Sequence, residues 1–106
     1  MTTIHADAEH QTVIATFDVT PGTCHDVLEK LIAAHREVIS HQPGFISVAI
    51  HVNDAQTRIA SYSQWRDRED YKAMLRTDEM RRRNREITAL CKSFEPVMYE
   101  VAEVIG

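Results

Sequence analysis

Residues 45–65 read FISVAIHVNDAQTRIASYSQW, and this stretch decides the fold. Both halves are rich in β-branched and aromatic residues, and Asn53-Asp54 between them is a turn signal. The pattern predicts two antiparallel strands, 45–52 and 58–65, that form a hairpin. In the second strand, alternation places four residues on one face, which we expect to look toward helices: Ile59, Ser61, Ser63 and Trp65.

The first strand of the hairpin also alternates. One set is apolar, and we expect it to face away from the helices: Ile46, Val48, Ile50 and Val52. The other set is expected to lie under the helices: Phe45, Ser47, Ala49 and His51. An apolar sheet face open to solvent favours a partner, so the pattern predicts a homodimer formed through the first set.

Outward from the hairpin, residues 13–19 (VIATFDV) alternate as a strand, and Thr23 is placed to cap a helix that runs to about Ser40. A helix capped by Asp67 and a fresh segment from Thr77 to about Cys91 follow the hairpin. Glu95-Pro96 is expected to end this helical region, and a last strand is expected over 97–105. The order βαββαβ predicts an α+β protein with a ferredoxin-like fold, whose two copies form a dimeric α+β barrel.

The composition indicates one small domain over residues 1–106, with residues 1–11 as a loose N-terminal tail. A net charge of −4 argues against a nucleic-acid partner. The basic run at Arg81–Arg83 and Arg85 has acidic neighbours, so we interpret it as a solvated helix face, with anion binding as the alternative. Two cysteines, no signal peptide and no run of about 20 apolar residues predict a cytoplasmic protein with free thiols and no membrane partner.

The common cofactor and catalytic motifs are absent from the sequence: it has no G-x-G-x-x-G, Walker A, H-E-x-x-H or G-x-S-x-G. Its six histidines are scattered, so we expect neither a metal site nor a cofactor. His35 lies on the apolar stripe of the first helix. Two interpretations stay open: a buried histidine bonded to a backbone carbonyl, or a functional residue that serves as a pocket wall or a proton acceptor.

Polar side chains on surfaces that should face the helices suggest a ligand cavity. Ser61 and Ser63 are small and leave space, His51 and Trp65 flank them, and Tyr71 lies one turn into the second helix. Trp65 also suits a purely structural role in the core.

Three segments resemble the antibiotic biosynthesis monooxygenase superfamily: HQPGFI at 41–46, SYSQW at 61–65 and YKAM at 71–74. The resemblance covers about residues 13–101. It implies a substrate pocket between sheet and helices in each half of a homodimer. Members include cofactor-free oxygenases and haem-degrading enzymes; the haem branch expects a histidine where this chain has Leu75.

In the oxygenase branch, the resemblance implies catalytic roles for Trp65, Tyr71 and Arg85 and a substrate contact for His51, with Ser61 at a further substrate-binding position. His35 and Ser63 are added as candidate substrate contacts from their helix and strand positions alone. Arg85 rests on the resemblance alone, because it lies off the Met80–Ile87 stripe. Ser61 stands where the relatives have an asparagine that donates to substrate oxygen.

The activity implied by the resemblance is cofactor-independent monooxygenation. The substrate would be a phenolic or anthrone-type polycyclic aromatic of a polyketide pathway, oxidised by dioxygen to a quinone. Two alternatives remain on the same scaffold: a non-oxidative small-molecule binding protein, and an isomerase or cyclase.

Overall fold

The computed structural model describes residues 10–106, and this part of the chain forms a four-stranded sheet and three α-helices. In chain order these are β1 (Gln11–Asp18), α1 (Pro21–Glu37), a 3₁₀ turn η1 (Ile39–His41), β2 (Phe45–Val52), β3 (Arg58–Trp65), α2 (Arg68–Arg76), α3 (Asp78–Thr88) and β4 (Ser93–Tyr99). The predicted α+β, ferredoxin-like order is confirmed. The N-terminal tail was expected over residues 1–11. Residues 1–9 lie outside the described part of the chain, and Gln11 already belongs to β1.

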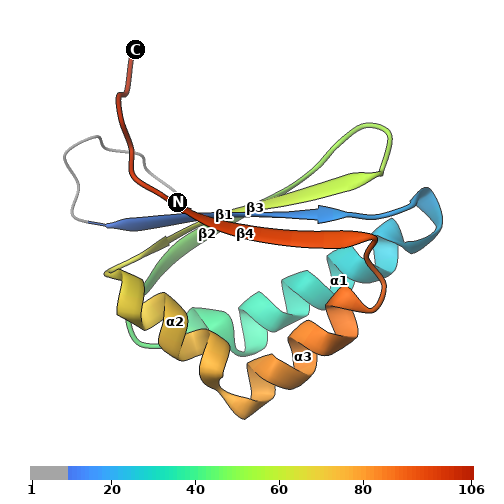
Figure 1. The fold of residues 1–106 in the computed structure, drawn as a ribbon, viewed down its shortest axis with the longest axis horizontal. Coiled ribbons are helices and arrows are strands. Elements are labelled where there is room, and N and C mark those ends of the chain that lie inside the picture. Colours follow the sequence, from blue (N-terminus) through green and yellow to red (C-terminus); the bar gives the residue numbers. More distant parts are fainter. Residues whose placement is uncertain (1–9) are drawn as a thin grey trace.

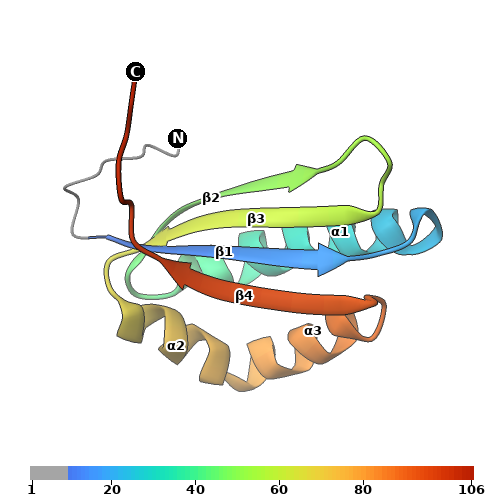
Figure 2. The ribbon, with the colours of Figure 1, turned by 45° about the horizontal axis from the view of Figure 1, so that its top comes forward.

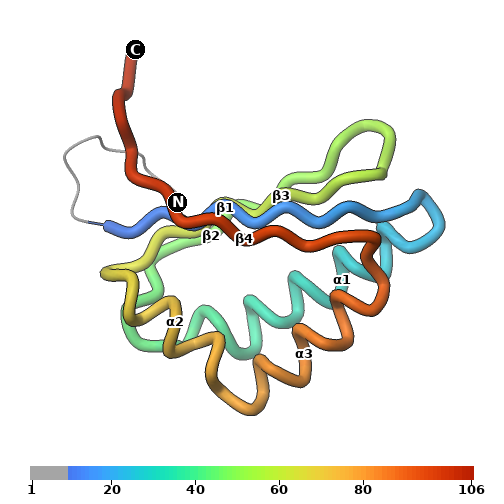
Figure 3. The backbone as a smooth tube through the Cα atoms, in the orientation of Figure 1, coloured from blue at the N-terminus to red at the C-terminus, as the bar shows by residue number. Residues whose placement is uncertain are grey.

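The sheet is antiparallel in the order β2-β3-β1-β4, as Figure 2 shows with the strands side by side. All three helices lie on one face of it, and no helix formed by residues 10–106 lies on the other face (Figures 1 and 3). Strands β1 and β3 form the centre, so their helix-facing residues are the best shielded from solvent.

The first helix begins earlier than expected. Thr20 is its N-cap, Pro21 occupies its first turn, and Thr20 and Thr23 complete a capping box. The expectation that Thr23 is the cap is therefore wrong. Proline lacks a backbone N–H, and the first turn of a helix leaves its N–H groups unpaired in any case, so the helix can begin at Pro21. The helix ends at Glu37, and η1 continues the chain to His41.

The helical region after β3 is split in two, as predicted. Asp67 caps α2 by accepting from the backbone N–H of Asp70 at 2.9 Å, and Thr77 caps α3 by accepting from that of Met80 at 3.2 Å. Thr77 is extended, and this break allows α2 and α3 to change direction along the sheet (Figure 1).

The last strand lies earlier than expected, over Ser93–Tyr99 instead of 97–105. Pro96, which was expected to end the preceding helical region, lies within the strand instead. It pairs with Ala15 of β1, and β4 is an edge strand, where a residue without an N–H is tolerated.

A β-bulge in β2 overturns the predicted faces of that strand. Phe45 pairs with Trp65, but Ser47 pairs with Gln64, so Ile46 is an extra residue that reverses the alternation. Val48 and Ile50 therefore lie opposite Ser63 and Ser61, on the helix-facing side. Ser47, Ala49 and His51 lie on the open face. The expectation of an outer apolar face made by Ile46, Val48, Ile50 and Val52 is wrong.

The core lies between the sheet and the helices. Its fully buried side chains come from every layer: Val13, Val27, Ile59, Trp65, Met80 and Ile87. Both cysteines are free thiols, as expected, with Cys24 in the core. In residues 10–106, no helix is long and apolar enough to cross a membrane.

Candidate active site

A cavity lies between the central strands and the helices, at the position predicted from the small residues of β3. Its accessible volume is about 40 Å³. The walls are mostly apolar, with polar groups from four elements. The lining residues are Val13, Ala15, Phe17, Leu31, His35, Ile39, Ser61, Ser63, Trp65, Tyr71, Met74, Leu75, Met80, Asn84 and Phe94.

The floor of the cavity is open because β3 carries serines where larger residues would fill it. Ser61 lies opposite Ala15 in the sheet, so two small side chains are neighbours there, and Ser63 lies opposite Val13. Both serines are 6% exposed. The Ser61 hydroxyl forms no hydrogen bond with any residue that the structure describes, which leaves it able to bind a ligand.

Trp65 is completely buried, and its polar edge already has a partner. Its Nε1–H donates to Ser63 Oγ at 3.2 Å, and that hydroxyl donates to the Val13 carbonyl at 3.4 Å. The indole also packs edge to face on Tyr71 and Phe45, with ring centroids 5.7 and 5.4 Å apart. Trp65 therefore forms part of the cavity wall, and its N–H is used in the hydrogen bond to Ser63.

Tyr71 lies in α2, with a side chain that is 8% exposed and a hydroxyl that has no partner among the described residues. Burial raises the pKa of Tyr71, so the phenol stays protonated at neutral pH. It is therefore a hydrogen-bond donor.

His35 lies on α1 and forms part of the opposite wall. Its Nδ1 is 2.9 Å from the Leu31 carbonyl oxygen, one turn earlier. The predicted bond to a backbone carbonyl is confirmed, and the residue also lines the cavity, while a role as proton acceptor stays a prediction. Burial lowers the pKa of His35, while the bond to Leu31 opposes this shift, so the ring is neutral near pH 7.

Asn84 is a cavity residue that the sequence analysis did not select. It lies on α3 in helical phase with Met80 and Ile87, both of which are buried. A polar residue within an apolar helical stripe was the available signal. Its side-chain amide has no hydrogen bond within the described residues, so it offers both a donor and an acceptor to a ligand.

Two predicted site residues lie elsewhere. His51 is exposed on the open face of β2, because the bulge at Ile46 moves it away from the helices. The expectation that it faces the cavity is wrong. Arg85 is exposed on α3 and does not line the cavity; its neighbour Asn84 does.

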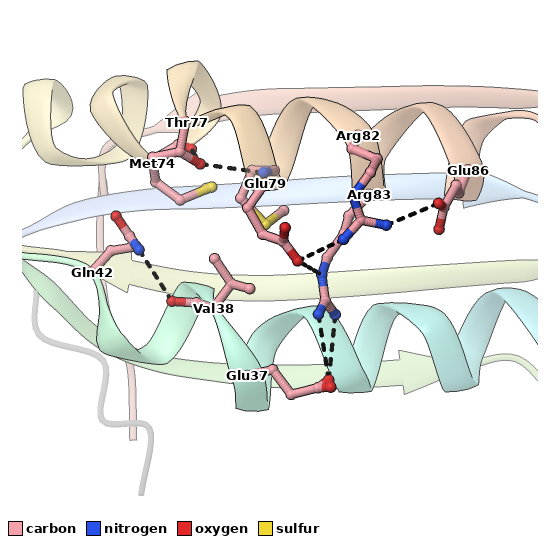
Figure 4. A network of polar contacts seen from close by, with 10 residues as sticks. Glu37, Val38, Gln42, Met74, Thr77, Glu79, Arg82, Arg83 and Glu86 are labelled. Atoms are coloured by element: carbon pink, nitrogen blue, oxygen red, sulfur yellow. Dashed lines mark hydrogen bonds and ion pairs between the residues drawn. The ribbon is translucent and has the colours of Figure 1, made fainter.

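The basic run of α3 belongs to a separate, ion-paired surface. Glu79 accepts from Arg82 at 2.7 Å and from Arg83 at 2.8 Å, and Arg83 also reaches Glu37 of α1 at 3.5 Å (Figure 4). Arg82 also pairs with Glu86. This pairing supports a solvated helix face.

Among residues 10–106, no three His, Cys, Asp or Glu side chains gather to hold a metal ion.

Fold and site together define a class: a ferredoxin-like α+β protein with a small aromatic-lined cavity under its helices. The family model for antibiotic biosynthesis monooxygenase matches residues 11–86. The chain belongs to the antibiotic biosynthesis monooxygenase family.

Named relatives agree with this assignment. Tetracenomycin-F1 monooxygenase of Streptomyces glaucescens is 30% identical over 74 residues, which cover 70% of this chain and 66% of that protein. The match thus spans slightly less than two thirds of the curated relative. The monooxygenase from the gene ActVA-Orf6 of Streptomyces coelicolor, solved with nanaomycin D, is 25% identical with a TM-score of 0.74, covering 90% of this chain and 89% of that one.

Two further solved structures share the fold. A putative antibiotic biosynthesis monooxygenase from Nitrosomonas europaea has a TM-score of 0.78 at 18% identity, covering 92% of this chain and 94% of that one. SnoaB, a cofactor-independent oxygenase from Streptomyces nogalater, has a TM-score of 0.75 at 17% identity, covering 92% and 98%.

Proposed function

We propose that this protein is a cofactor-independent monooxygenase that oxidises a phenolic or anthrone-type aromatic of a polyketide pathway to a quinone. The observation that carries the proposal is the cavity itself. It is apolar, lies between sheet and helices, and presents polar groups without partners among the described residues, on Ser61, Tyr71 and Asn84. Family membership and the names of the relatives point to the same chemistry.

The reaction needs a substrate that is itself the reductant. Loss of a proton makes an anthrone or hydroquinone electron-rich, and the anion gives electrons to dioxygen. In an anthrone, the methylene carbon loses two hydrogens and gains one oxygen atom, and the second oxygen atom leaves as water. The role of the protein is to bind the substrate, exclude water and stabilise the developing oxyanion.

The polar groups of the cavity suit that role. Tyr71 and Asn84 project from α2 and α3 and Ser61 from β3, so donors lie on opposite walls of one space. The resemblance implies an asparagine at position 61, where this chain has a serine. The Asn84 side chain lines the same cavity and would supply the amide in its place. Trp65 contributes a rigid aromatic wall, held by its bond to Ser63.

A polycyclic substrate must enlarge this cavity, because sites for ligands of that size measure about 300–1,000 Å³. The walls that would move carry Met74, Leu75 and Met80, and methionine adapts readily to new shapes. The helix break at Thr77 lies between the two segments that carry them. We propose that α2 and α3 separate from the sheet when substrate enters.

We further propose that the working form is a homodimer that buries the open face of the sheet. The strand register places Ile14, Val97, Tyr62 and Ala49 side by side across that face. Val97 and Tyr99 of that face are 36% and 46% exposed, and contact with a second copy would remove this apolar surface from water.

Oxygen uptake tests the proposed function. Purified protein, dialysed against a chelator, is mixed with a panel of anthrones and hydroquinones in an oxygen electrode. We expect saturable uptake with one dioxygen consumed per anthrone. Tight binding of the panel without uptake would contradict the proposal and favour the binding-protein or isomerase alternatives.

A further inference from the structure

His35 has one ring nitrogen occupied and one free. A carbonyl oxygen can only accept, so the contact with Leu31 fixes the proton on Nδ1 and leaves the lone pair on Nε2. No described residue donates to Nε2. The helix backbone therefore holds the imidazole as a neutral ring whose other nitrogen is a hydrogen-bond acceptor.

Among the residues that the structure describes, the cavity has no competing base. Of the fifteen residues that line it, only His35 and Tyr71 titrate. Tyr71 stays protonated, because burial raises its pKa, and it acts as a donor. The other walls present no charge: β1, β3 and β4 contribute apolar groups and two serines, while α2 and α3 contribute, apart from Tyr71, apolar side chains and Asn84.

His35 also borders a second site near the surface. It lines a second, open surface depression beside β2, together with Arg36, Ser40 and Phe45. Arg36 is the only charged side chain among the described residues that line that depression. The imidazole thus lies between the cavity and a surface depression, although only 9% of the residue is exposed.

We propose that His35 is the catalytic base of this site and takes the phenolic proton of the bound substrate at Nε2. The substrate O–H bond breaks, the N–H bond forms, and the electron pair stays on the oxygen as phenolate. The imidazolium lies beside the phenolate, while Tyr71, Ser61 and Asn84 are available to donate to it. This inference rests on the proposed function, in that it names the first step of the same site.

A chromogenic phenol reads this step without oxygen chemistry. p-Nitrophenol turns yellow on ionisation and is smaller than the expected substrate. Bound to the wild type, it should ionise at a pH about one unit below that of the free phenol, a tenfold shift in its acid constant. His35→Gln should abolish the shift. His51→Gln, which changes an exposed histidine on the other face, should leave it intact.

A second measurement uses the wild-type protein, so its result does not depend on whether the His35→Gln variant folds. Heteronuclear NMR of the imidazole nitrogens should show His35 as the Nδ1–H form, converting to imidazolium when p-nitrophenol binds. A free Nδ1, an unshifted bound phenol, or no binding of p-nitrophenol at millimolar concentration would each overturn the proposal.

Oxygen uptake then gives a separate result. His35→Gln should lower kcat for an anthrone by about 10²–10⁴-fold, as loss of a general base does. An uptake rate unchanged in His35→Gln would refute the base and leave the oxygenase standing. Conversely, the protein could ionise p-nitrophenol through His35 and yet consume no oxygen with any anthrone. That result would refute the proposed oxygenase activity and support His35 as a base.

Discussion

At the scale of single residues, the hydroxyl of Tyr71 is a better candidate for contact with substrate than the indole of Trp65. The Trp65 N–H is donated to Ser63, whereas the Tyr71 hydroxyl has no partner among the described residues. Substitutions at the two positions therefore differ in meaning. Loss of the indole disturbs packing with Phe45 and Tyr71, while loss of the phenol oxygen removes one donor and little volume.

Tyr71→Phe should lower kcat/KM for oxygen uptake by about 10²–10³-fold if this hydroxyl stabilises the developing oxyanion. The matched control is Tyr62→Phe. The Tyr62 hydroxyl is also buried and makes no hydrogen bond with the described residues, but its strand position faces away from the cavity. The control should keep its rate. Equal rates in both variants would reduce Tyr71 to a wall of the cavity.

His35 should also make stability depend on pH. Its pKa is lowered in the folded state from an ordinary value of 6.5, so the unfolded chain binds more protons around that pH. The free energy of unfolding should therefore fall as the pH drops below about 6.5. Urea unfolding across this range should show a smaller loss for His35→Gln than for the wild type, and parallel curves would contradict the burial of a neutral ring.

At the scale of elements, the turn before β2 depends on a glycine. Gly44 has φ +82°, and its carbonyl accepts from the Arg66 backbone N–H at 2.7 Å. A Cβ at this position would overlap the carboxylate of Asp70, which is held in place by two hydrogen bonds from Arg66. The turn thus fixes the start of β2 against the start of α2.

Gly44→Ala should destabilise the protein by about 1–3 kcal/mol, from the left-handed backbone and the overlap with Asp70. The control is Gly22→Ala in the first turn of α1, where a Cβ meets only Thr20 Oγ1 at 3.7 Å. That change should be neutral or stabilising by up to about 1 kcal/mol. Equilibrium denaturation compares the two, and similar values would refute the account of the turn.

Local chemistry made most elements predictable. The caps at Asp67 and Thr77, the hairpin and the element order follow from short-range patterns. The bulge could not be predicted in this way. The residues of FISVAIHV alternate as in a regular strand, and the sequence does not reveal that the extra residue moves each later side chain to the opposite face of the sheet. Pro96 misled for a related reason: its effect depends on β4 being an edge strand, which the topology decides.

The same distinction applies to the candidate site. Ser61, Ser63, Trp65, Tyr71 and His35 were predictable as one cluster, because helical and strand phases point them to the same interior. His51 was misplaced by the bulge, and Arg85 came from the resemblance and not from phase. Asn84 was overlooked, although its stripe was visible.

At the scale of the whole molecule, the corrected register changes which substitution probes the dimer. Val97 lies on the open face and Val52 on the helix-facing side, both on edge strands and 36% and 44% exposed. Val97→Asp should weaken a dimer that buries the open face, because it would bury an unpaired charge. Val52→Asp should leave it intact.

Sedimentation velocity at micromolar concentration decides between these outcomes. We expect the wild type and Val52→Asp to sediment as dimers and Val97→Asp to shift toward monomer. A monomeric wild type would contradict the homodimer, and dissociation by Val52→Asp alone would place the interface on the other side of the sheet.

The most direct test of the central claim is the fate of the oxygen atoms. The metal-depleted protein is given an anthrone under isotopically heavy dioxygen, and the product is weighed by mass spectrometry. A monooxygenase of the proposed kind yields a quinone with one heavy oxygen atom from the gas, and the second atom appears in water. Unlabelled product, or turnover that returns only when a metal or flavin is added, would contradict it.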